Sequence, residues 1–287
     1  MPSERRGGPD WHVPESLEEA LALRARLGEE AMVVAGGTFA GILVRQRLVA
    51  PSAFIYLGQV QGLADVNAGT AELRLGAMVS HRMIVEAPQV GTGWPSLAAT
   101  FAVVASPRVR NQATLGGVLC DADYASDPPA MLAALDAWVL LRSPAEERQV
   151  PVAEFITGHY QTQLRSDELL IEVRVPRTRG RATYLKFKSR SSEDRPCVGV
   201  AAVAEVDGGG RCRELRVVVG AVYDRPQLLP DVCNMATGER LTGELAAEIG
   251  AAYAARLPTI SDVRGSARYR SRVLAVCVRR ALEALAA

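Results

Sequence analysis

Two glycine clusters are the residues of this chain best suited to chemistry. They are V-V-A-G-G-T-F-A at residues 33–40 and R-N-Q-A-T-L-G-G-V at residues 110–118. Consecutive glycines let backbone N–H groups approach an anion with no Cβ in the way, and a helix that begins there adds partial positive charge. The pattern suits a diphosphate, although a single cluster is more often only a tight turn. Neither cluster has G-x-G-x-x-G or G-x-x-x-x-G-K-[ST] spacing, which disfavours a Rossmann or P-loop site.

The second glycine cluster is followed by an acidic run, C-D-A-D-Y-A-S-D-P-P-A, which contains Asp121, Asp123 and Asp127. A calcium loop is disfavoured because the run has no glycine at its sixth position and no glutamate at its end. We expect Asp127 either to accept hydrogen bonds from a ribose or to cap a helix that begins near Pro129.

No arrangement of acid, base and nucleophile accompanies these motifs. His12, His81 and His159 are far apart, no G-x-S-x-G elbow is present, and the five cysteines include no C-x-x-C pair. We therefore expect no metal site on this chain and no disulfide framework. An enzyme built from it would need a cofactor to do its chemistry.

The charge composition is nearly balanced, with 33 Lys and Arg against 32 Asp and Glu in 287 residues. Such a chain has no long-range field that would attract nucleic acid or an anionic membrane. No apolar run reaches the ~18 residues of a membrane span, and residues 1–10 are polar and unlike a signal peptide. These features predict a cytoplasmic protein with no nucleic-acid partner and no membrane span.

The elements that must position the motifs form an α+β pattern. The first unit alternates helix and strand signals, with helices at 16–27 and from the glycine turn to about 47, and strands at 31–35 and 54–57. A second subdomain holds the other glycine cluster and ends with a strand at 169–175, which Pro176 terminates.

The last part of the chain reads as a separate sheet with helices. Alternating β-branched residues predict three antiparallel strands, and alanine-rich amphipathic segments predict two helices; these lie at residues 182–188, 198–206, 215–222, 243–256 and 268–287. We therefore expect a domain at residues 1–176, with subdomains at about 1–57 and 58–176, and a second domain at residues 177–287.

Taken together, the motifs resemble the FAD-binding medium subunit of the molybdenum hydroxylases, the flavoprotein of bacterial carbon monoxide, xanthine and nicotine dehydrogenases. The likeness runs through W-H-V-P-E-S-L-E-E-A-L-A-L, A-G-G-T-F-A-G-I-L-V-R-Q-R-L, V-R-N-Q-A-T-L-G-G-V-L-C-D-A-D-Y-A-S-D-P-P-A and D-E-L-L-I-E-V-R-V-P. It implies a two-subdomain FAD-binding fold of the PCMH or vanillyl-alcohol-oxidase type, followed by a C-terminal domain with a three-stranded antiparallel sheet and helices.

The resemblance also implies where a non-covalent FAD would bind, between the two subdomains. The diphosphate would be held mainly by main-chain N–H groups of Val34, Ala35, Gly36, Gly37, Thr38, Phe39 and Ala40, and of Thr114, Leu115, Gly116, Gly117 and Val118. Asp127 would hold the adenosine ribose, and Val104, Leu170 and Lys186 would lie near the flavin. A Lys186 cation there would favour the negative charge of the reduced flavin; the alternative is an exposed strand lysine.

Four places depart from the commonest pattern of that family. Thr38-Phe39 stands in place of His-Ser, Val118 in place of Asn or Asp, and Tyr124 in place of proline. Arg195 stands where an aromatic or aliphatic residue often meets the flavin. The changes at Phe39 and Val118 leave the main-chain N–H donors of these residues in place. Arg195 is expected to affect the reduction potential of the flavin and the access of the electron acceptor.

The function that the resemblance implies is electron relay. A large partner subunit with molybdopterin would hydroxylate the substrate, and [2Fe-2S] clusters on a small partner subunit would pass electrons to this flavin and on to an external acceptor, in a dimer of heterotrimers. Two alternatives remain open from the sequence. One is a self-sufficient flavin oxidase or reductase, and the other is a scaffold subunit that has lost FAD.

Overall fold

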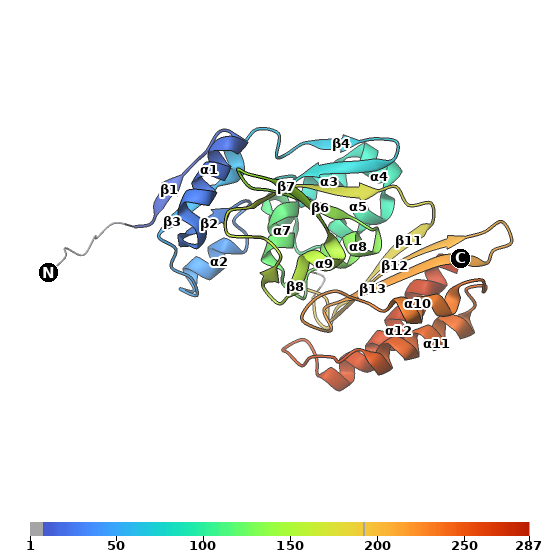
Figure 1. Ribbon diagram of the computed structural model, residues 1–287. Helices are drawn as coiled ribbons and strands as arrows, with labels where there is room; N and C mark the ends of the chain where they lie inside the picture. Colours follow the sequence, from blue (N-terminus) through green and yellow to red (C-terminus); the bar gives the residue numbers. More distant parts are fainter. Residues whose placement is uncertain (1–7, 192, 287) are drawn as a thin grey trace.

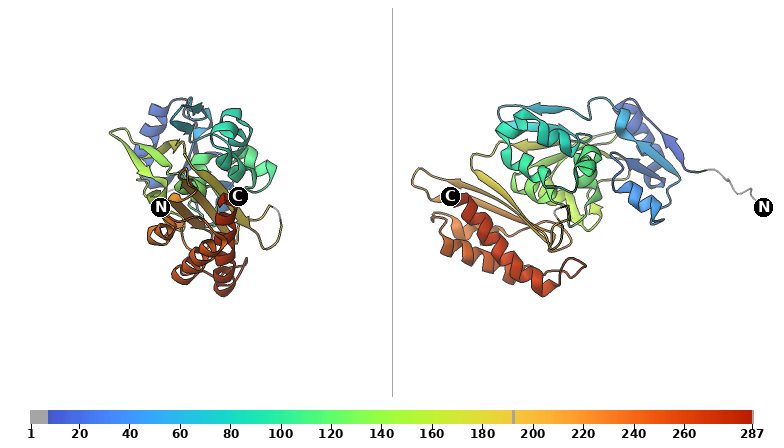
Figure 2. Two further views of the ribbon diagram at one scale, coloured as in Figure 1. Left: turned by 90° about the vertical axis from the view of Figure 1, so that its right-hand side faces the viewer. Right: turned by 180° about the vertical axis from the view of Figure 1, so that it is seen from behind.

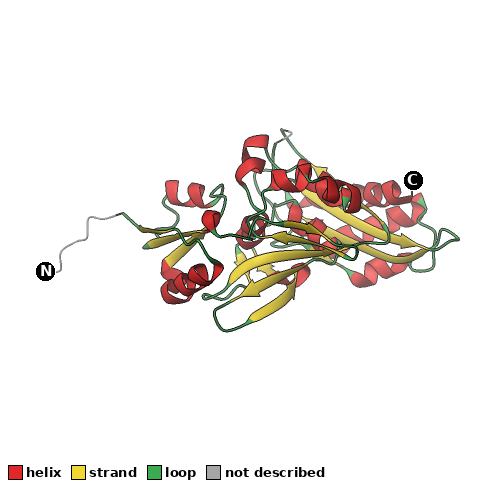
Figure 3. Cartoon of the chain, turned by 90° about the horizontal axis from the view of Figure 1, so that it is seen from above, coloured by secondary structure: helices red, strands yellow, loops and turns green. Residues whose placement is uncertain are grey.

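The computed structural model describes residues 8–191 and 193–286 (Figure 1). Its N-terminal unit is a parallel three-stranded sheet with strand order β1-β3-β2, flanked by two helices. The elements are β1 (Asp10–His12), α1 (Leu17–Leu27), β2 (Ala31–Val34), α2 (Ala40–Arg45) and β3 (Ala53–Tyr56). Figure 3 shows this unit to one side of the remaining chain. Strand β1, which is only three residues long, was not among the predicted elements.

The start of α1 shows why the sequence folds here as predicted. The Ser16 hydroxyl accepts a hydrogen bond from the Glu19 N–H at 3.2 Å, and the Glu19 carboxylate accepts one from the Glu15 N–H at 3.0 Å. The first bond satisfies an N–H group that a helix start leaves open, and the second ties the residue before the N-cap to the first turn of the helix. The helix ends at Gly28, whose φ of 51° suits glycine.

The second region is built on an antiparallel sheet with strand order β4-β5-β10-β6-β7, in which the last strand of the region occupies the centre. Its helices α3 to α8 pack beside this sheet (Figure 1). The elements are β4 (Val66–Ala68), β5 (Glu72–Gly76), α3 (His81–Glu86), α4 (Pro88–Gly93), α5 (Pro95–Ala102), α6 (Pro107–Gln112), α7 (Leu115–Asp121), α8 (Pro128–Ala134), β6 (Trp138–Arg142), β7 (Glu147–Pro151), α9 (Val152–Phe155), β8 (Ile156–Gly158), β9 (Gln161–Thr162) and β10 (Leu169–Pro176).

The C-terminal region has one strand more than predicted. Its antiparallel sheet has the order β11-β12-β13-β14, and the prediction of three strands is wrong because Leu228 and Gln227 pair with Val218 and Val219. A two-residue strand is too short to show a period in the sequence. The elements are β11 (Arg181–Phe187), β12 (Val198–Val206), β13 (Cys212–Gly220), β14 (Gln227–Leu228), α10 (Pro230–Cys233), α11 (Gly243–Arg256) and α12 (Ala267–Ala286). The predicted last residue of this helix, Ala287, lies outside the described residues.

Strand β12 is buried on both faces, which explains its continuous small and β-branched sequence. Ala201 and Val203 belong to the core that includes α8, whereas Val200 and Ala202 belong to the core that includes α11 and α12. Figures 1 and 2 show α11 and α12 covering the face of this sheet that points away from the rest of the molecule. One hydrophobic core contains residues from both sides of residue 176. The domain boundary predicted at that residue therefore stays a prediction.

Candidate functional site

A cavity of about 820 Å³ gathers the predicted site residues from all three regions of the chain. It lies where the turn between β2 and α2 meets α7, the segment before α8, and strand β11. All the predicted site residues line it except Val34 and Leu115, whose side chains are buried in the surrounding structure. Its volume is within the range of ~300–1,000 Å³ that is usual for small-molecule sites.

The first glycine cluster forms a turn whose backbone donors are available to a ligand. The N–H groups of Gly36, Gly37 and Thr38 make no hydrogen bond to another group among the residues that the structure describes. Gly37 has a φ of 68°, which glycine adopts without strain. Since these three residues line the cavity, the turn presents a set of unsatisfied N–H groups of the kind that binds anions.

Gly36 is required for a second reason, which the sequence does not show. A Cβ at this position would lie 1.7 Å from the backbone oxygen of Gln112, the last residue of α6. The absent side chain therefore makes room for the protein's own backbone. This contact joins the two glycine clusters, which are about seventy positions apart along the chain.

The second glycine cluster uses its backbone donors within the protein. Thr114 caps α7, and its hydroxyl accepts from the Gly117 N–H at 3.1 Å. The N–H groups of Leu115 and Gly116 donate to the carbonyls of Val79 at 2.9 Å and Ala77 at 2.8 Å. The predicted role of residues 114–118 in holding a diphosphate through main-chain N–H groups stays a prediction; the N–H groups of residues 115–118 are already engaged, whereas that of Thr114 has no partner among the described residues.

Asp127 and Lys186 lie in direct contact, although the resemblance assigned them to the ribose and the flavin. The Lys186 Nζ donates to Asp127 Oδ2 at 2.9 Å and to the Val103 carbonyl at 2.9 Å, and the Tyr184 hydroxyl donates to Asp127 Oδ1 at 2.8 Å. The side chains of Asp127 and Lys186 are each 4% exposed. Lys186 is therefore a buried, paired cation rather than an exposed strand lysine.

Burial and hydrogen bonding set the charge states in this cluster. Desolvation raises the pKa of Asp127, and the nearby Lys186 opposes that rise. Desolvation and the Asp127 carboxylate raise the pKa of Tyr184 well above its usual value, so that its hydroxyl stays protonated and remains a donor. The expected N-cap role of Asp127 is not seen, since its side chain makes no cap hydrogen bond to α8.

The remaining predicted residues form part of the cavity wall. Val104 and Leu170 line it, and so does His81, which is almost fully buried. Desolvation lowers the pKa of His81 to about 4, so His81 adds no charge to the cavity wall at neutral pH. We therefore expect this part of the cavity to accept a neutral, largely apolar group.

Two of the residues that depart from the family pattern line the cavity and contact other side chains. Arg195 forms an ion pair with the buried Asp123. Phe39 lies 5.4 Å from Tyr160, measured between ring centroids, so the first glycine turn contacts the β8–β9 hairpin. Tyr124 lies outside the cavity lining, and its hydroxyl donates to Asp262 Oδ2 at 2.5 Å, which ties the segment before α8 to the segment before α12.

Sequence reasoning missed several residues that line the cavity. Cys120 and Asp121 at the end of α7 were not assigned a role, and neither was Tyr160. An apolar part of the wall was also missed; it consists of Met32, Ile42, Leu43, Leu48, Val49 and Leu57. Cys120 and Asp121 follow Gly117 by three and four positions. In a helix that begins at Thr114 these three residues share one face, and this spacing could have identified the two missed residues.

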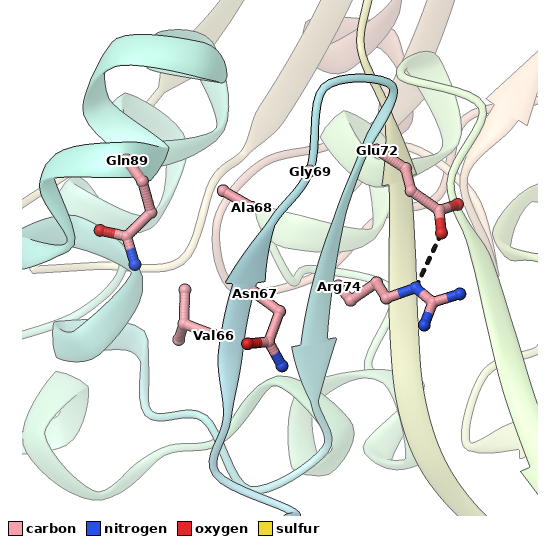
Figure 4. Close-up of a pocket in the computed structure, with 7 residues that line it drawn as sticks. All are labelled: Val66, Asn67, Ala68, Gly69, Glu72, Arg74 and Gln89. Carbon is pink, nitrogen blue, oxygen red and sulfur yellow. Dashed lines mark hydrogen bonds and ion pairs between the residues drawn. The ribbon is translucent and has the colours of Figure 1, made fainter.

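A second hollow lies at the β4–β5 hairpin, beside α4 (Figure 4). Its charged residues, Glu72 and Arg74, bind each other at 2.8 Å. It contains none of the predicted site residues, and we assign it no role. Among the described residues, no group of three or more potential ligands is placed to hold a metal ion, and no helix is long and apolar enough to cross a membrane.

The cavity thus combines free backbone donors, a buried cation and an apolar wall, which suits a ligand with a diphosphate and an aromatic ring system. Comparison with known families gives the same result. Residues 5–178 match the model of the FAD binding domain in molybdopterin dehydrogenase, and residues 182–285 match the C-terminal domain of the CO dehydrogenase flavoprotein. The chain belongs to the flavoproteins of the molybdopterin dehydrogenase family. The resemblance seen in the sequence is confirmed.

Several relatives of this flavoprotein match it along nearly their whole length. The nicotine 6-hydroxylase medium subunit of Paenarthrobacter nicotinovorans is 33% identical over 94% of each chain. The carbon monoxide dehydrogenase medium chain of Hydrogenophaga pseudoflava is 28% identical over 96% of each chain. Among solved structures, quinoline 2-oxidoreductase from Pseudomonas putida 86 superposes with a TM-score of 0.92 and 30% identity, covering 99% of this chain and 98% of that one.

The FAD binding domain of this flavoprotein fits its cofactor on structural grounds. The three free N–H groups of the first glycine turn are placed to bind a diphosphate, and the apolar wall is suited to a flavin or an adenine ring. Lys186 supplies the only side-chain cation besides Arg195 among the described residues of the cavity lining.

Cys120 of the flavoprotein offers a way to locate the ligand. Its side chain is exposed within the cavity, whereas Cys197, Cys212, Cys233 and Cys277 are buried. Because this thiol is exposed, it is the cysteine of the described structure that an alkylating reagent reaches most readily. We expect saturating FAD to slow iodoacetamide labelling of Cys120 several-fold, measured by peptide mass spectrometry. Equal labelling rates with and without bound FAD would place the cofactor elsewhere, and Cys120→Ser identifies the labelled peptide.

Proposed function

We propose that this chain is the FAD-carrying electron-transfer subunit of a heterotrimeric molybdenum hydroxylase. In this proposal it receives electrons from iron–sulfur clusters of a partner subunit and passes them to an external acceptor. The observation that carries the proposal is the turn at Gly36, Gly37 and Thr38, whose free N–H groups line the same cavity as the buried cation of Lys186. A cavity that combines backbone donors, a buried cation and an apolar wall suits a dinucleotide cofactor.

The cofactor supplies the redox chemistry, since a flavin exchanges electrons singly or in pairs. The chain's own residues would hold and orient it without a covalent bond. The first glycine turn would bind the diphosphate, Val104 and Leu170 would contact the flavin, and Lys186 would favour negative charge on the reduced ring. Because Asp127 contacts Lys186 directly, we propose that it holds that cation in place rather than binding the ribose.

The names of the relatives support the proposed partners. Matching chains include medium subunits and medium chains of dehydrogenases, which by their names are parts of larger complexes. We propose that a large subunit carries molybdopterin, that a small subunit carries [2Fe-2S] clusters, and that the cytoplasmic complex is a dimer of heterotrimers. We further propose that residues 1–176 form the FAD-binding domain and residues 177–287 the C-terminal domain.

The proposal is tested by removing FAD from the assembled complex. The complex is reduced with a limited amount of dithionite, and its reoxidation by candidate acceptors is followed before and after FAD removal and after reconstitution. We expect reduction to bleach the iron–sulfur absorbance both with and without FAD. The clusters should be reoxidised rapidly only when FAD is bound. Unchanged reoxidation by every acceptor without FAD would contradict the proposal. Turnover of a small substrate by the isolated chain would favour a self-sufficient flavin oxidase instead.

A further inference from the structure

We infer that Asp121, at the end of α7, is a further FAD-binding residue, whose carboxylate accepts hydrogen bonds from the hydroxyl groups next to the diphosphate. This inference rests on the proposed binding of FAD in the cavity. Oδ1 of Asp121 is buried and has no hydrogen-bond partner among the described residues, and the side chain lines the cavity. A buried polar atom of this kind normally has a partner, which here is missing from the protein itself.

The position of Asp121 along α7 places it near the sugar hydroxyls of a bound FAD. Gly117 lies beside Ala35, since a Cβ on Gly117 would be 4.0 Å from the Ala35 Cβ, and Ala35 immediately precedes the free donors of the first glycine turn. Asp121 is four residues further along the same helix, on the same face and about one turn away, which is ~5.4 Å. A diphosphate bound at the turn therefore brings its adjacent ribityl or ribose hydroxyls toward this carboxylate.

The other two aspartates of the acidic run are already engaged, and the remaining carboxylate of the cavity lining, Glu193, is exposed. Asp127 binds Tyr184 and Lys186 through both of its oxygens, and Asp123 pairs with Arg195 and accepts from the Ala125 N–H at 2.8 Å. Asp121 is thus the cavity aspartate whose buried oxygen lacks a partner within the described structure. A hydroxyl donor from the ligand would satisfy it, whereas a phosphate would be repelled.

The surroundings of Asp121 make its ionised form costly in the absence of a ligand. Desolvation, followed by the Asp123 carboxylate, raises the pKa of Asp121 to about 7, and Arg195 opposes the rise. The thiol of Cys120 and the hydroxyl of Tyr160 are the other titratable groups that interact with it. Because the folded chain holds this proton up to about pH 7 and the unfolded chain releases it near pH 4, the stability of the apo chain falls as pH rises through that window.

These features give Asp121→Ala two effects of opposite sign. FAD affinity at pH 8 is expected to fall about tenfold or more, as for loss of a hydrogen bond to a charged acceptor. The apo chain is expected to become more stable at pH 8, with a smaller gain at pH 5, because an unpartnered buried carboxylate has been removed. Affinity is measured by quenching of flavin fluorescence, and stability by the midpoint of thermal unfolding without FAD.

The controls separate this inference from the proposed function. Asp121→Asn keeps an acceptor and should lose less affinity than alanine, and Asp65→Ala removes an exposed carboxylate outside the cavity and should change neither quantity. Titration with ADP and with FMN shows which hydroxyls are bound, because ADP carries only the ribose and FMN only the ribityl chain.

Two results would overturn the role of Asp121 while leaving FAD binding intact. One is wild-type affinity in Asp121→Ala, and the other is a loss of affinity together with a lower unfolding midpoint of the apo chain, which would indicate a structural role. Failure of the wild-type chain to bind FAD would instead overturn the proposed function.

Discussion

Replacing Gly36 with alanine is expected to abolish FAD retention and to lower the free energy of unfolding by about 3 kcal/mol. The reason is steric, because the new Cβ would lie 1.7 Å from the Gln112 oxygen and 2.6 Å from its carbonyl carbon. Both neighbours are backbone atoms, which cannot move aside as a flexible side chain can. The free energy is measured by urea unfolding, and FAD retention by the ratio of flavin to protein absorbance.

The matched control for this substitution is Gly41→Ala, in the helix that follows the same turn. A Cβ at Gly41 meets no atom within 4 Å, and its φ is not in the left-handed range. Alanine there should leave FAD retention unchanged and stabilise the chain slightly, since alanine is the better helix former by ~1 kcal/mol. Equal effects of the two substitutions would contradict the close packing of the two glycine clusters.

Replacing Asp127 with alanine is expected to lower the free energy of unfolding by about 3–5 kcal/mol, because it leaves the buried Lys186 cation without its partner. Both side chains are only 4% exposed, and their ion pair spans 2.9 Å. Urea unfolding at pH 7 measures the loss. In protein that still binds FAD, the unpaired cation should raise the reduction potential of the flavin, whereas Lys186→Met should lower it.

A double-mutant cycle separates the pair from the packing around it. Combining Asp127→Leu with Lys186→Met replaces two buried charges by apolar groups, and it should recover most of the stability that the single changes lose. Additive losses would show that the two side chains act independently. Tyr184→Phe, which removes one hydrogen bond to Asp127, should cost about 1 kcal/mol and serves as the milder control.

The elements that surround the site could be predicted from the sequence, whereas the contacts between their side chains could not. Periodicity and glycine turns located α1, β2, β3, β12 and both glycine clusters, because each depends on local pattern. The pairing of Asp127 with Lys186 was not predicted, since the two residues are 59 positions apart and meet only through tertiary packing. The role of Gly36 in admitting the Gln112 carbonyl was missed for the same reason.

Asp121 shows a different limit of sequence reasoning. Its neighbours in the acidic run drew attention to metal binding, and Asp127 was favoured as the ribose ligand. Only the structure shows that Asp127 and Asp123 are engaged, whereas Oδ1 of Asp121 is buried without a partner among the described residues. Hydrogen-bond satisfaction depends on the surrounding fold, and a linear motif does not record it.

Non-covalent binding of FAD in the cavity behind the first glycine turn is measured by titrating the isolated apo chain with FAD and following flavin fluorescence. We expect saturation at one FAD per chain, full release of unmodified FAD on denaturation, and much weaker binding of FMN, which lacks one phosphate and the adenosine. Absence of saturable FAD binding by correctly folded protein, or FMN binding as tight as that of FAD, would contradict this expectation.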